Sequence, residues 1–179
     1  MPSFNDKKSR PLALLCAAVA LAAAAGTRAA DFAVFDLHLA QGKNFKRLTL
    51  GAETDPAWSR GLSWGRVDLL AEFGLAYWRA DQPGANDRLW QLNAIPIVRW
   101  WPTERFYLEG GVGLTVFDRT RFIDKELSTA FQFGDHLGLG WQLTPSIRIG
   151  ARVSHFSNAA IKRPNPGLDA TQLTLAYRF

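Results

Sequence analysis

Cysteine is almost absent from this chain: Cys16 is the only one, and it lies within an apolar run from Leu12 to Ala25. Basic residues precede the run and small residues follow it, which is the pattern of a secretory signal peptide. Cleavage after Ala29 is expected, because cleavage after Ala30 would leave Arg28 where a small residue is needed. The mature chain, which loses its cysteine with the signal, then has no disulfide and no thiol chemistry.

Long apolar runs and an excess of positive charge are lacking as well. After the predicted signal peptide at residues 1–29, no stretch approaches the ~18 consecutive apolar residues of a transmembrane helix, which excludes a helical membrane protein. Residues 30–179 retain 17 basic and 15 acidic side chains, with no basic stripe interleaved with aromatics. A nucleic-acid partner is therefore not expected. These 150 residues are enough for one domain.

What the chain has instead is alternation of apolar residues with polar or small ones. Apolar side chains occupy every second position at 67–77, 106–116 and 147–153, and this period of two indicates β-strands. Followed along the chain, the pattern predicts eight strands, at residues 33–41, 45–53, 64–78, 88–101, 104–118, 127–142, 145–158 and 170–179.

The other face of these strands carries charge, for example at Glu72, Arg99 and Arg152. A soluble sandwich could not bury many charges in its core without loss of stability, whereas a barrel with a polar interior can pair them. The strand lengths suit tilted strands across a bilayer, which need about 9 to 11 residues. Alternation up to a terminal Phe179 is typical of outer-membrane barrels. The sequence thus predicts an all-β fold, an eight-stranded antiparallel transmembrane β-barrel of the outer membrane, over residues 30–179.

Tryptophan and loop length suggest how such a barrel is oriented. Short turns are periplasmic and long loops extracellular in these barrels. The tight connections are 101–104 and 143–146, and the longer ones are 79–88, 119–126 and 159–169. The segment 54–63 is an exception, a long periplasmic connection with room for a short helix. An interfacial aromatic girdle is expected from tryptophans near strand ends: Trp78, Trp90, Trp100, Trp101 and Trp141.

Histidine, serine and an acid come together at the extracellular end of the predicted barrel. His155 and Ser157 stand two residues apart on one strand and so share a face, and Asp169 opens the antiparallel neighbour. All three keep the register of the apolar, lipid-facing residues, where a charge costs about 2 to 4 kcal/mol at the midplane and less near an interface. Such a cost favours a function. An imidazole that takes the serine proton and a carboxylate that orients it are the parts of a hydrolase triad.

The run from His155 to Ala159, the segment from Lys162 to Gly167 and an acid fourteen residues after the histidine resemble the outer-membrane lipid A 3-O-deacylases of the PagL type. The resemblance implies an eight-stranded barrel with an outward-facing Ser-His-acid triad, which hydrolyses the ester-linked hydroxyacyl chain at the 3-position of lipid A. It assigns catalysis to His155, Ser157 and Asp169. The family's acid is usually glutamate, which is one methylene longer.

The same loop supplies candidate substrate contacts. Asn165 aligns with a family position proposed to supply an amide to the oxyanion, and Asn158 is the weaker alternative. Lys162 and Arg163 are candidates for binding lipid A phosphates, together with basic residues of the preceding loop, Arg119, Arg121 and Lys125. The expected partner is lipopolysaccharide of the outer leaflet. A homodimer is left open.

The other histidines are expected to be structural. His38 shares its register with Asp36, and His136 shares its register with Gln132, so both should face the barrel interior. Three histidines scattered over separate strands lack the spacing of metal ligands, and the resembled family uses no metal. No cofactor is expected.

Asp135 does not fit the pattern, because it falls in the apolar register of its strand between Phe133 and Leu137. Either a β-bulge shifts the parity there or Asp135 serves the site. A rival to the hydrolase hypothesis also stays open at this point. It is a small non-catalytic outer-membrane barrel that acts as an adhesin, a structural anchor or a binding module.

Overall fold

A computed structural model describes residues 32–84 and 86–179 of the chain. The predicted signal peptide and its cleavage site lie outside the described residues. The strands are β1 (Phe32–Gly42), β2 (Phe45–Thr54), β3 (Trp58–Leu62), β4 (Gly65–Ala80), β5 (Arg88–Trp101), β6 (Phe106–Phe117), β7 (Arg121–Phe122), β8 (Lys125–Glu126), β9 (Phe131–Gln142), β10 (Ile147–Ser157) and β11 (Leu168–Arg178). Within these residues, no helix is long and apolar enough to cross a membrane.

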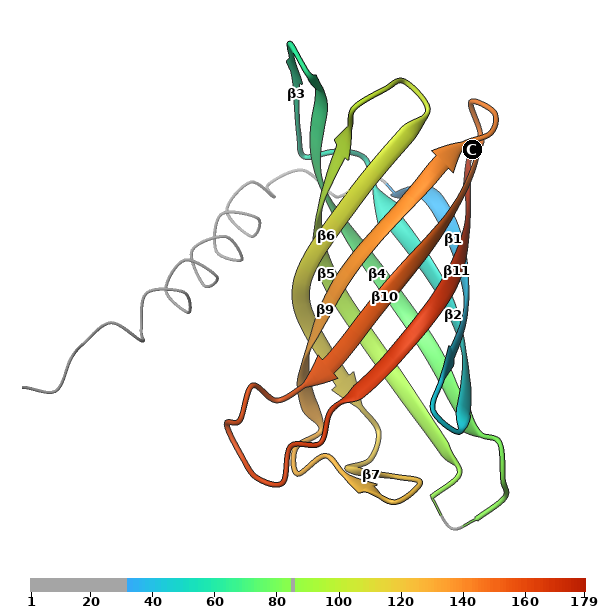
Figure 1. Cartoon of the computed structure of the whole chain (residues 1–179), viewed down its shortest axis with the longest axis vertical. Helices are drawn as coiled ribbons and strands as arrows, with labels where there is room; N and C mark the ends of the chain where they lie inside the picture. The colour runs from blue at the N-terminus through green and yellow to red at the C-terminus, as the bar shows by residue number, and fades with distance from the viewer. Residues whose placement is uncertain (1–31, 85) are drawn as a thin grey trace, which may run out of the picture. The chain divides into compact units, whose positions relative to one another are not determined.

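Eight of the strands close into an antiparallel barrel (Figure 1). Neighbours pair in the order β1, β2, β4, β5, β6, β9, β10 and β11, and β11 pairs back with β1. Closure gives each of these strands a hydrogen-bonded neighbour on both sides, which removes the exposed edges of an open sheet. The predicted eight-stranded barrel is confirmed, and each predicted strand overlaps one of the eight.

The connection between β2 and β4 differs from the prediction. It contains the strand β3, which pairs with the start of β4 from Trp58 opposite Leu69 to Leu62 opposite Gly65. Part of the segment for which the sequence left room for a short helix thus forms a strand instead. The hairpin turns tightly at Gly65, whose φ is +127° and where a Cβ would lie 2.2 Å from the Trp101 carbonyl oxygen, so a side chain is excluded there. β2 pairs with β4 only from residue 72 onward. The start of β4 therefore has a free edge, and residues 58–62 pair with it.

The three long loops after β4, β6 and β10 lie at the same end of the barrel. The β3–β4 hairpin, the turns after β5 and β9 and the C-terminus lie at one end, whereas the loops after β4, β6 and β10 lie at the other (Figure 1). The stretch from His155 to Asp169 is thus at the long-loop end.

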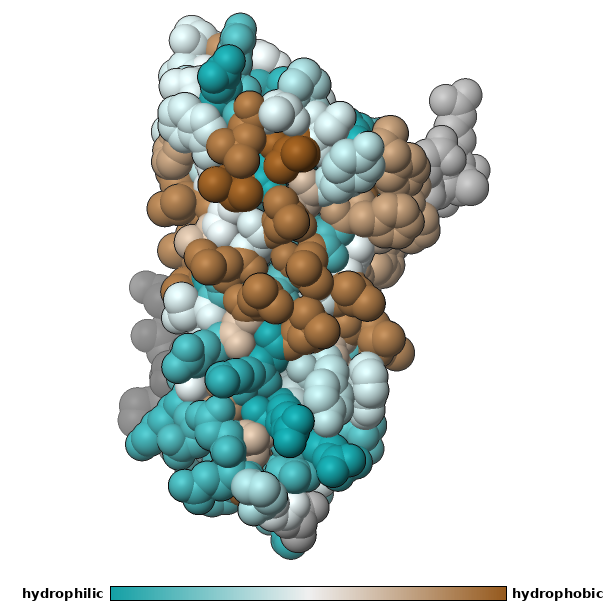
Figure 2. All heavy atoms as spheres, turned by 90° about the vertical axis from the view of Figure 1, so that its right-hand side faces the viewer, coloured by the Kyte–Doolittle hydropathy of each residue, from teal (hydrophilic) through white to brown (hydrophobic). Residues whose placement is uncertain are grey.

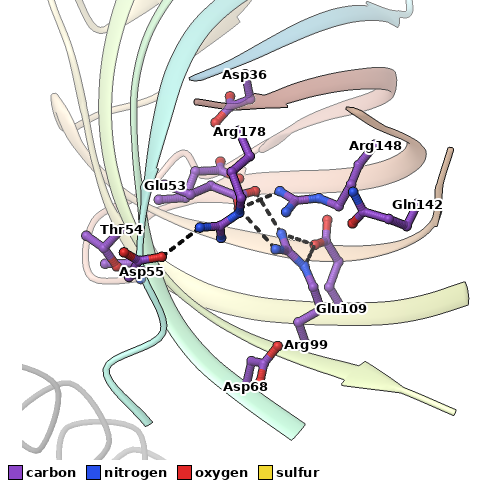
Figure 3. Close-up of polar contacts among 12 residues, drawn as sticks. Asp36, Glu53, Thr54, Asp55, Asp68, Arg99, Glu109, Gln142, Arg148 and Arg178 are labelled. Carbon is purple, nitrogen blue, oxygen red and sulfur yellow. Dashed lines mark hydrogen bonds and ion pairs between the residues drawn. The ribbon is translucent and has the colours of Figure 1, made fainter. Parts of the chain in front are cut away.

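The barrel interior is held by paired charges (Figure 3). Arg99 bridges Glu53 and Glu109 at 2.8 Å each, and Arg148 reaches Glu53 at 2.6 Å. Arg152 continues the chain of ion pairs to Glu109 and to Glu72, at 2.6 and 2.8 Å. All six side chains are buried. Because an unpaired charge in such a place is strongly destabilising, this reciprocal pairing explains how one face of each strand can be charged.

An apolar cluster fills the interior toward the long-loop end. Its buried members are Ala40, Phe45, Ala76, Trp78, Leu89, Phe117, Phe122, Leu127, Phe156, Leu168 and Ala170. They come from barrel strands and from the β7–β8 loop, so the loops and the barrel share one core. Phe156 and Leu168 matter most for the site, because each is the chain neighbour of a predicted triad residue.

Two tryptophans depart from the predicted girdle. Trp78 and Trp101 are buried inside the barrel, where Trp78 Nε1 donates to Gln91 Oε1 at 2.7 Å and Trp101 Nε1 donates to Asp68 Oδ2 at 2.8 Å. Buried indole N–H groups need such acceptors, and the polar interior supplies them. The other three, Trp90, Trp100 and Trp141, are exposed or half-exposed near strand ends.

The outer face of the barrel is apolar over its middle. Figure 2 shows a brown band of apolar side chains between teal ends. Exposed leucines and valines of successive strands contribute to the apolar face, among them Leu39, Leu50, Val153, Leu173 and Leu175. Apolar side chains outside and charges inside are the reverse of a soluble protein, and this is the arrangement of a barrel that crosses a bilayer.

Phe156 anchors the end of β10 to the interior cluster. Its ring is fully buried and lies 5.4 Å from that of Trp78 and 6.1 Å from that of Phe117, centroid to centroid. The Arg47 guanidinium lies 5.4 Å from the same ring. These contacts fix the backbone between positions 155 and 157.

Phe156→Ala should therefore destabilise the barrel by about 3–5 kcal/mol, the usual cost of removing a buried phenylalanine. Urea unfolding of the refolded protein in detergent measures the change. Val153→Ala is the matched control, because Val153 lies on the same strand but is 52% exposed on the outer face, and it should change stability little. Equal unfolding midpoints for the two variants would contradict the anchoring role.

Candidate active site

His155 and Asp169 face each other across β10 and β11. They are direct partners in the register of the two strands, and His155 Nδ1 lies 2.6 Å from Asp169 Oδ1. The side chains are 44% and 78% exposed, whereas their neighbours Phe156 and Leu168 are buried. In the neutral ring, an Nδ1–H donated to this carboxylate leaves Nε2 as the proton acceptor.

Ser157 ends β10 on the same face as His155. It is half-buried, in the outward register that Ile149, Ala151 and Val153 define along the strand. Residues two apart on a strand are separated by about 6.6 Å along its axis, a span that the two side chains can bridge. The hydrogen bonds among the described residues include none between Ser157 and His155. Nucleophile and base are often loosely placed without substrate.

Asn158 organises the loop that follows. Its side chain is fully buried and its Nδ2 donates to the carbonyl of Lys162 at 2.8 Å and to that of Leu127 at 3.2 Å. Its backbone N–H donates to Asn165 Oδ1 at 3.1 Å. The Asn158 amide thus points inward, on the opposite face from His155 and Ser157. The contact to Asn165 uses its side-chain oxygen, which leaves its amide nitrogen available for another partner.

A second loop supports the first. Lys125 Nζ donates to the Gly167 carbonyl at 2.7 Å, and Ser128 Oγ donates to the Pro164 carbonyl at 2.6 Å. Figure 1 shows the β7 hairpin beside the loop between β10 and β11. Sequence reasoning missed these contacts. They are long-range contacts between two irregular segments, for which no periodicity gives a signal.

Most of the basic residues near the site have partners. Lys125 holds the Gly167 carbonyl, and Arg119 and Arg121 pair with the acids Asp118 and Glu126 at 3.2 and 3.3 Å. Lys162 and Arg163, in contrast, are exposed at the tip of the loop after β10, and no ion pair joins either to a described residue. These two cations are therefore better placed than the other three to meet an anionic ligand.

Gly167 packs directly against the imidazole. Its φ is +63°, and a Cβ there would lie 2.6 Å from His155 Cε1 and 3.2 Å from Nε2. Only glycine combines this left-handed backbone with such a close approach to the ring. The loop therefore returns to β11 across one edge of His155, while Asp169 binds the ring at Nδ1.

Asp135 lies on the other side of His155. The registers of β9 with β10 and with β6 run without a shift through this position, so a bulge does not explain the parity. Asp135 is the direct cross-strand partner of His155. The sequence left two explanations open, and the register excludes the first.

The remaining histidines face the interior, as expected. His38 Nε2 lies 2.9 Å from Asp36 Oδ1, and His136 Nδ1 lies 2.7 Å from Ser154 Oγ. Asp36, His38 and Glu72 are buried, and their ligand atoms lie within 4.8 Å of one another, a spacing that a metal ion could use. Sequence spacing gave no sign of this group, because its members come from two strands. Glu72 also contacts Arg152 at 2.8 Å, so one member of this group has a cation as a neighbour.

The family model for lipid A 3-O-deacylase (PagL) matches residues 46–178. The chain belongs to this family. It is 51% identical over 175 residues to a lipid A deacylase PagL of Bordetella bronchiseptica, covering 97% of this chain and 98% of the relative. A lipid A deacylase PagL of Pseudomonas aeruginosa is 30% identical over 170 residues, covering 93% of this chain and 96% of the relative.

A solved structure agrees with the fold. The crystal structure of the outer membrane enzyme PagL superposes with a TM-score of 0.73 at 25% identity, covering 82% of this chain and all of that one. Family and fold together make this chain an outer-membrane β-barrel, as the alternation of the sequence predicted.

Proposed function

We propose that the protein is an ester hydrolase that removes the 3-O-linked hydroxyacyl chain from lipid A of lipopolysaccharide. The relatives in its family are named for lipid A deacylation. The observation that carries the proposal is the 2.6 Å contact between His155 and Asp169, with Ser157 on the same face of β10. That face is apolar along the rest of the barrel, so a substrate that reaches this site comes from the membrane.

Ser157 is the nucleophile and His155 the general base in this proposal. Nε2 takes the proton of the Ser157 hydroxyl as Oγ attacks the ester carbonyl, and later gives it to the leaving alcohol of the sugar. Asp169 keeps the tautomer that leaves Nε2 free and stabilises the imidazolium. Water then hydrolyses the acyl-enzyme by the same steps, which releases the hydroxy acid.

The oxyanion that forms on the ester carbonyl needs donors close to Ser157. The Asn165 amide nitrogen is the first candidate, because Asn165 Oδ1 is occupied by the backbone N–H of Asn158. Backbone N–H groups after Ser157 are further candidates. The buried Asn158 amide then acts indirectly, since it holds the loop in shape through Lys162 and Leu127.

The site lies on the lipid-facing wall at the level of the outer leaflet in this proposal. The long loops are extracellular by the usual rule for such barrels, and β10 ends at that side. Lys162 and Arg163 are exposed at the tip of the adjoining loop, where they would meet the phosphates of lipid A. The loop after β10 would then bind the phosphorylated sugar headgroup, and the outer wall of the barrel would bind the acyl ester.

Ser157→Ala and His155→Asn should each abolish deacylation, because triad members act as a unit and the loss of one typically costs many orders of magnitude. Mass spectrometry of lipid A from cells that express each variant measures the 3-O-acyl chain. Ser63→Ala is the control, a serine in the exposed turn before β4, and should deacylate normally. A folded Ser157→Ala barrel that still hydrolyses the ester would exclude the serine mechanism. Wild-type protein that leaves purified lipid A intact would favour the non-catalytic barrel.

Asp169→Ala should impair deacylation severely but less than Ser157→Ala, since loss of the acid leaves more activity than loss of the nucleophile in comparable triads. Asp169→Glu should keep measurable activity, because glutamate is the usual acid of the resembled family. Initial rates on detergent-dispersed lipid A measure both. An Asp169→Ala variant at the wild-type rate would mean that another group orients His155.

Gly167→Ala should lower kcat by about tenfold or more, because the added methyl group would overlap the His155 ring and the left-handed backbone disfavours alanine. Gly61→Ala is the matched control: it lies in the exposed β3–β4 hairpin, where an added Cβ meets nothing within 4 Å. The same rate assay compares the two. Unchanged kcat in Gly167→Ala would show that the ring tolerates displacement.

A further inference from the structure

Three outward-facing side chains form a row across three strands at the site. Asp135 on β9 is the cross-strand partner of His155 on β10, and His155 is the partner of Asp169 on β11. Direct cross-strand neighbours hold their Cβ atoms about 4.5–5.5 Å apart. The imidazole therefore has a carboxylate on either side, one from each adjacent strand.

The location of Asp135 on the outer face of β9 has no structural explanation. The outward positions around it on β9 are apolar: Phe131, Phe133, Leu137, Leu139 and Trp141. No salt bridge joins Asp135 to a cation among the described residues. A carboxylate on an apolar outer face is unfavourable unless it serves a group nearby, and the group opposite it in the register is His155.

We infer that Asp135 is a positioning residue of the reaction, acting on His155 from the side opposite Asp169. The inference rests on the proposed function. When Ser157 gives its proton to Nε2, the imidazole ring becomes a positively charged imidazolium. Asp169 contacts the ring at Nδ1, Gly167 covers the Cε1–Nε2 edge, and Asp135 is the charge that faces the ring from β9. Asp169 alone fixes the tautomer of the neutral ring, whereas Asp169 and Asp135 together stabilise the imidazolium.

Asp135 and Asp169 act on the His155 ring in different ways. Asp169 fixes the ring by a direct contact. Asp135 faces the ring from β9 and acts through its charge. Opposite charges within about 4–6 Å favour the charged form of each other, and poor screening at the membrane surface strengthens the effect. Asp135 should matter most in the step that charges the ring and little in the binding of lipid A.

The test is Asp135→Asn, which removes the charge and keeps the shape. Initial rates on detergent-dispersed lipid A should show kcat lowered by about 10- to 100-fold, with KM within threefold of wild type. Asp135→Glu should recover part of the loss, and Asp135→Ser should match Asp135→Asn. Asp124→Asn is the control, an exposed aspartate in the turn between β7 and β8 that should leave both constants unchanged.

A second comparison separates charge from structure. Asp135→Asn placed in the Asp169→Ala background should remove most of the remaining activity, because the ring then has neither carboxylate. A kcat of Asp135→Asn within twofold of wild type would overturn the inference, as would a loss confined to KM. If Ser157→Ala is inactive while Asp135→Asn is normal, the inference alone fails. If Ser157→Ala is active, the proposed mechanism fails and the inference fails with it.

Discussion

The register between β10 and its two neighbours is the constraint on which the rest of this structure depends. Because side chains alternate faces along a strand, a slip of one residue would exchange every inward and outward group. Arg148 and Arg152 would then leave their glutamates and face lipid, while His155 and Ser157 would enter the interior. The ion pairs of these two arginines inside the barrel therefore hold the outward groups in place as well.

The interior is divided between two kinds of packing. Paired charges fill the part toward the short turns, and an apolar cluster fills the part toward the long loops. The apolar part lies directly behind the candidate active site, where Phe156 and Leu168 face inward between the outward-facing groups. Close packing inside the barrel fixes the position of side chains on the outer face. This matters for a catalytic group, because small displacements of such groups lower the rate.

The loops complete the site in a way that the barrel alone could not. Lys125 and Ser128 bind backbone carbonyls of the loop after β10, and Asn158 binds the carbonyl of Lys162 in the same loop and that of Leu127 in the segment after β8. Polar side chains therefore fix a loop that has little regular structure of its own. This fixed path brings Gly167 against the His155 ring, and Asp169, the second residue of β11 and the cross-strand partner of His155, contacts Nδ1.

The sequence by itself determined the barrel, its strands and the face on which most of their side chains lie, because a period of two is a local property that each strand carries alone. It also singled out His155, Ser157 and Asp169, since the two strands that carry them are joined by one loop. Only the tertiary structure decided that Trp78 and Trp101 point inward, that β3 extends the sheet, that Lys125 holds the loop and that Asp135 stands beside His155. Trp101 and Lys125 have partners in distant segments. The registers of β3 with β4 and of β9 with β10 depend on which side chains pack across the strands, and a period of two does not specify that pairing.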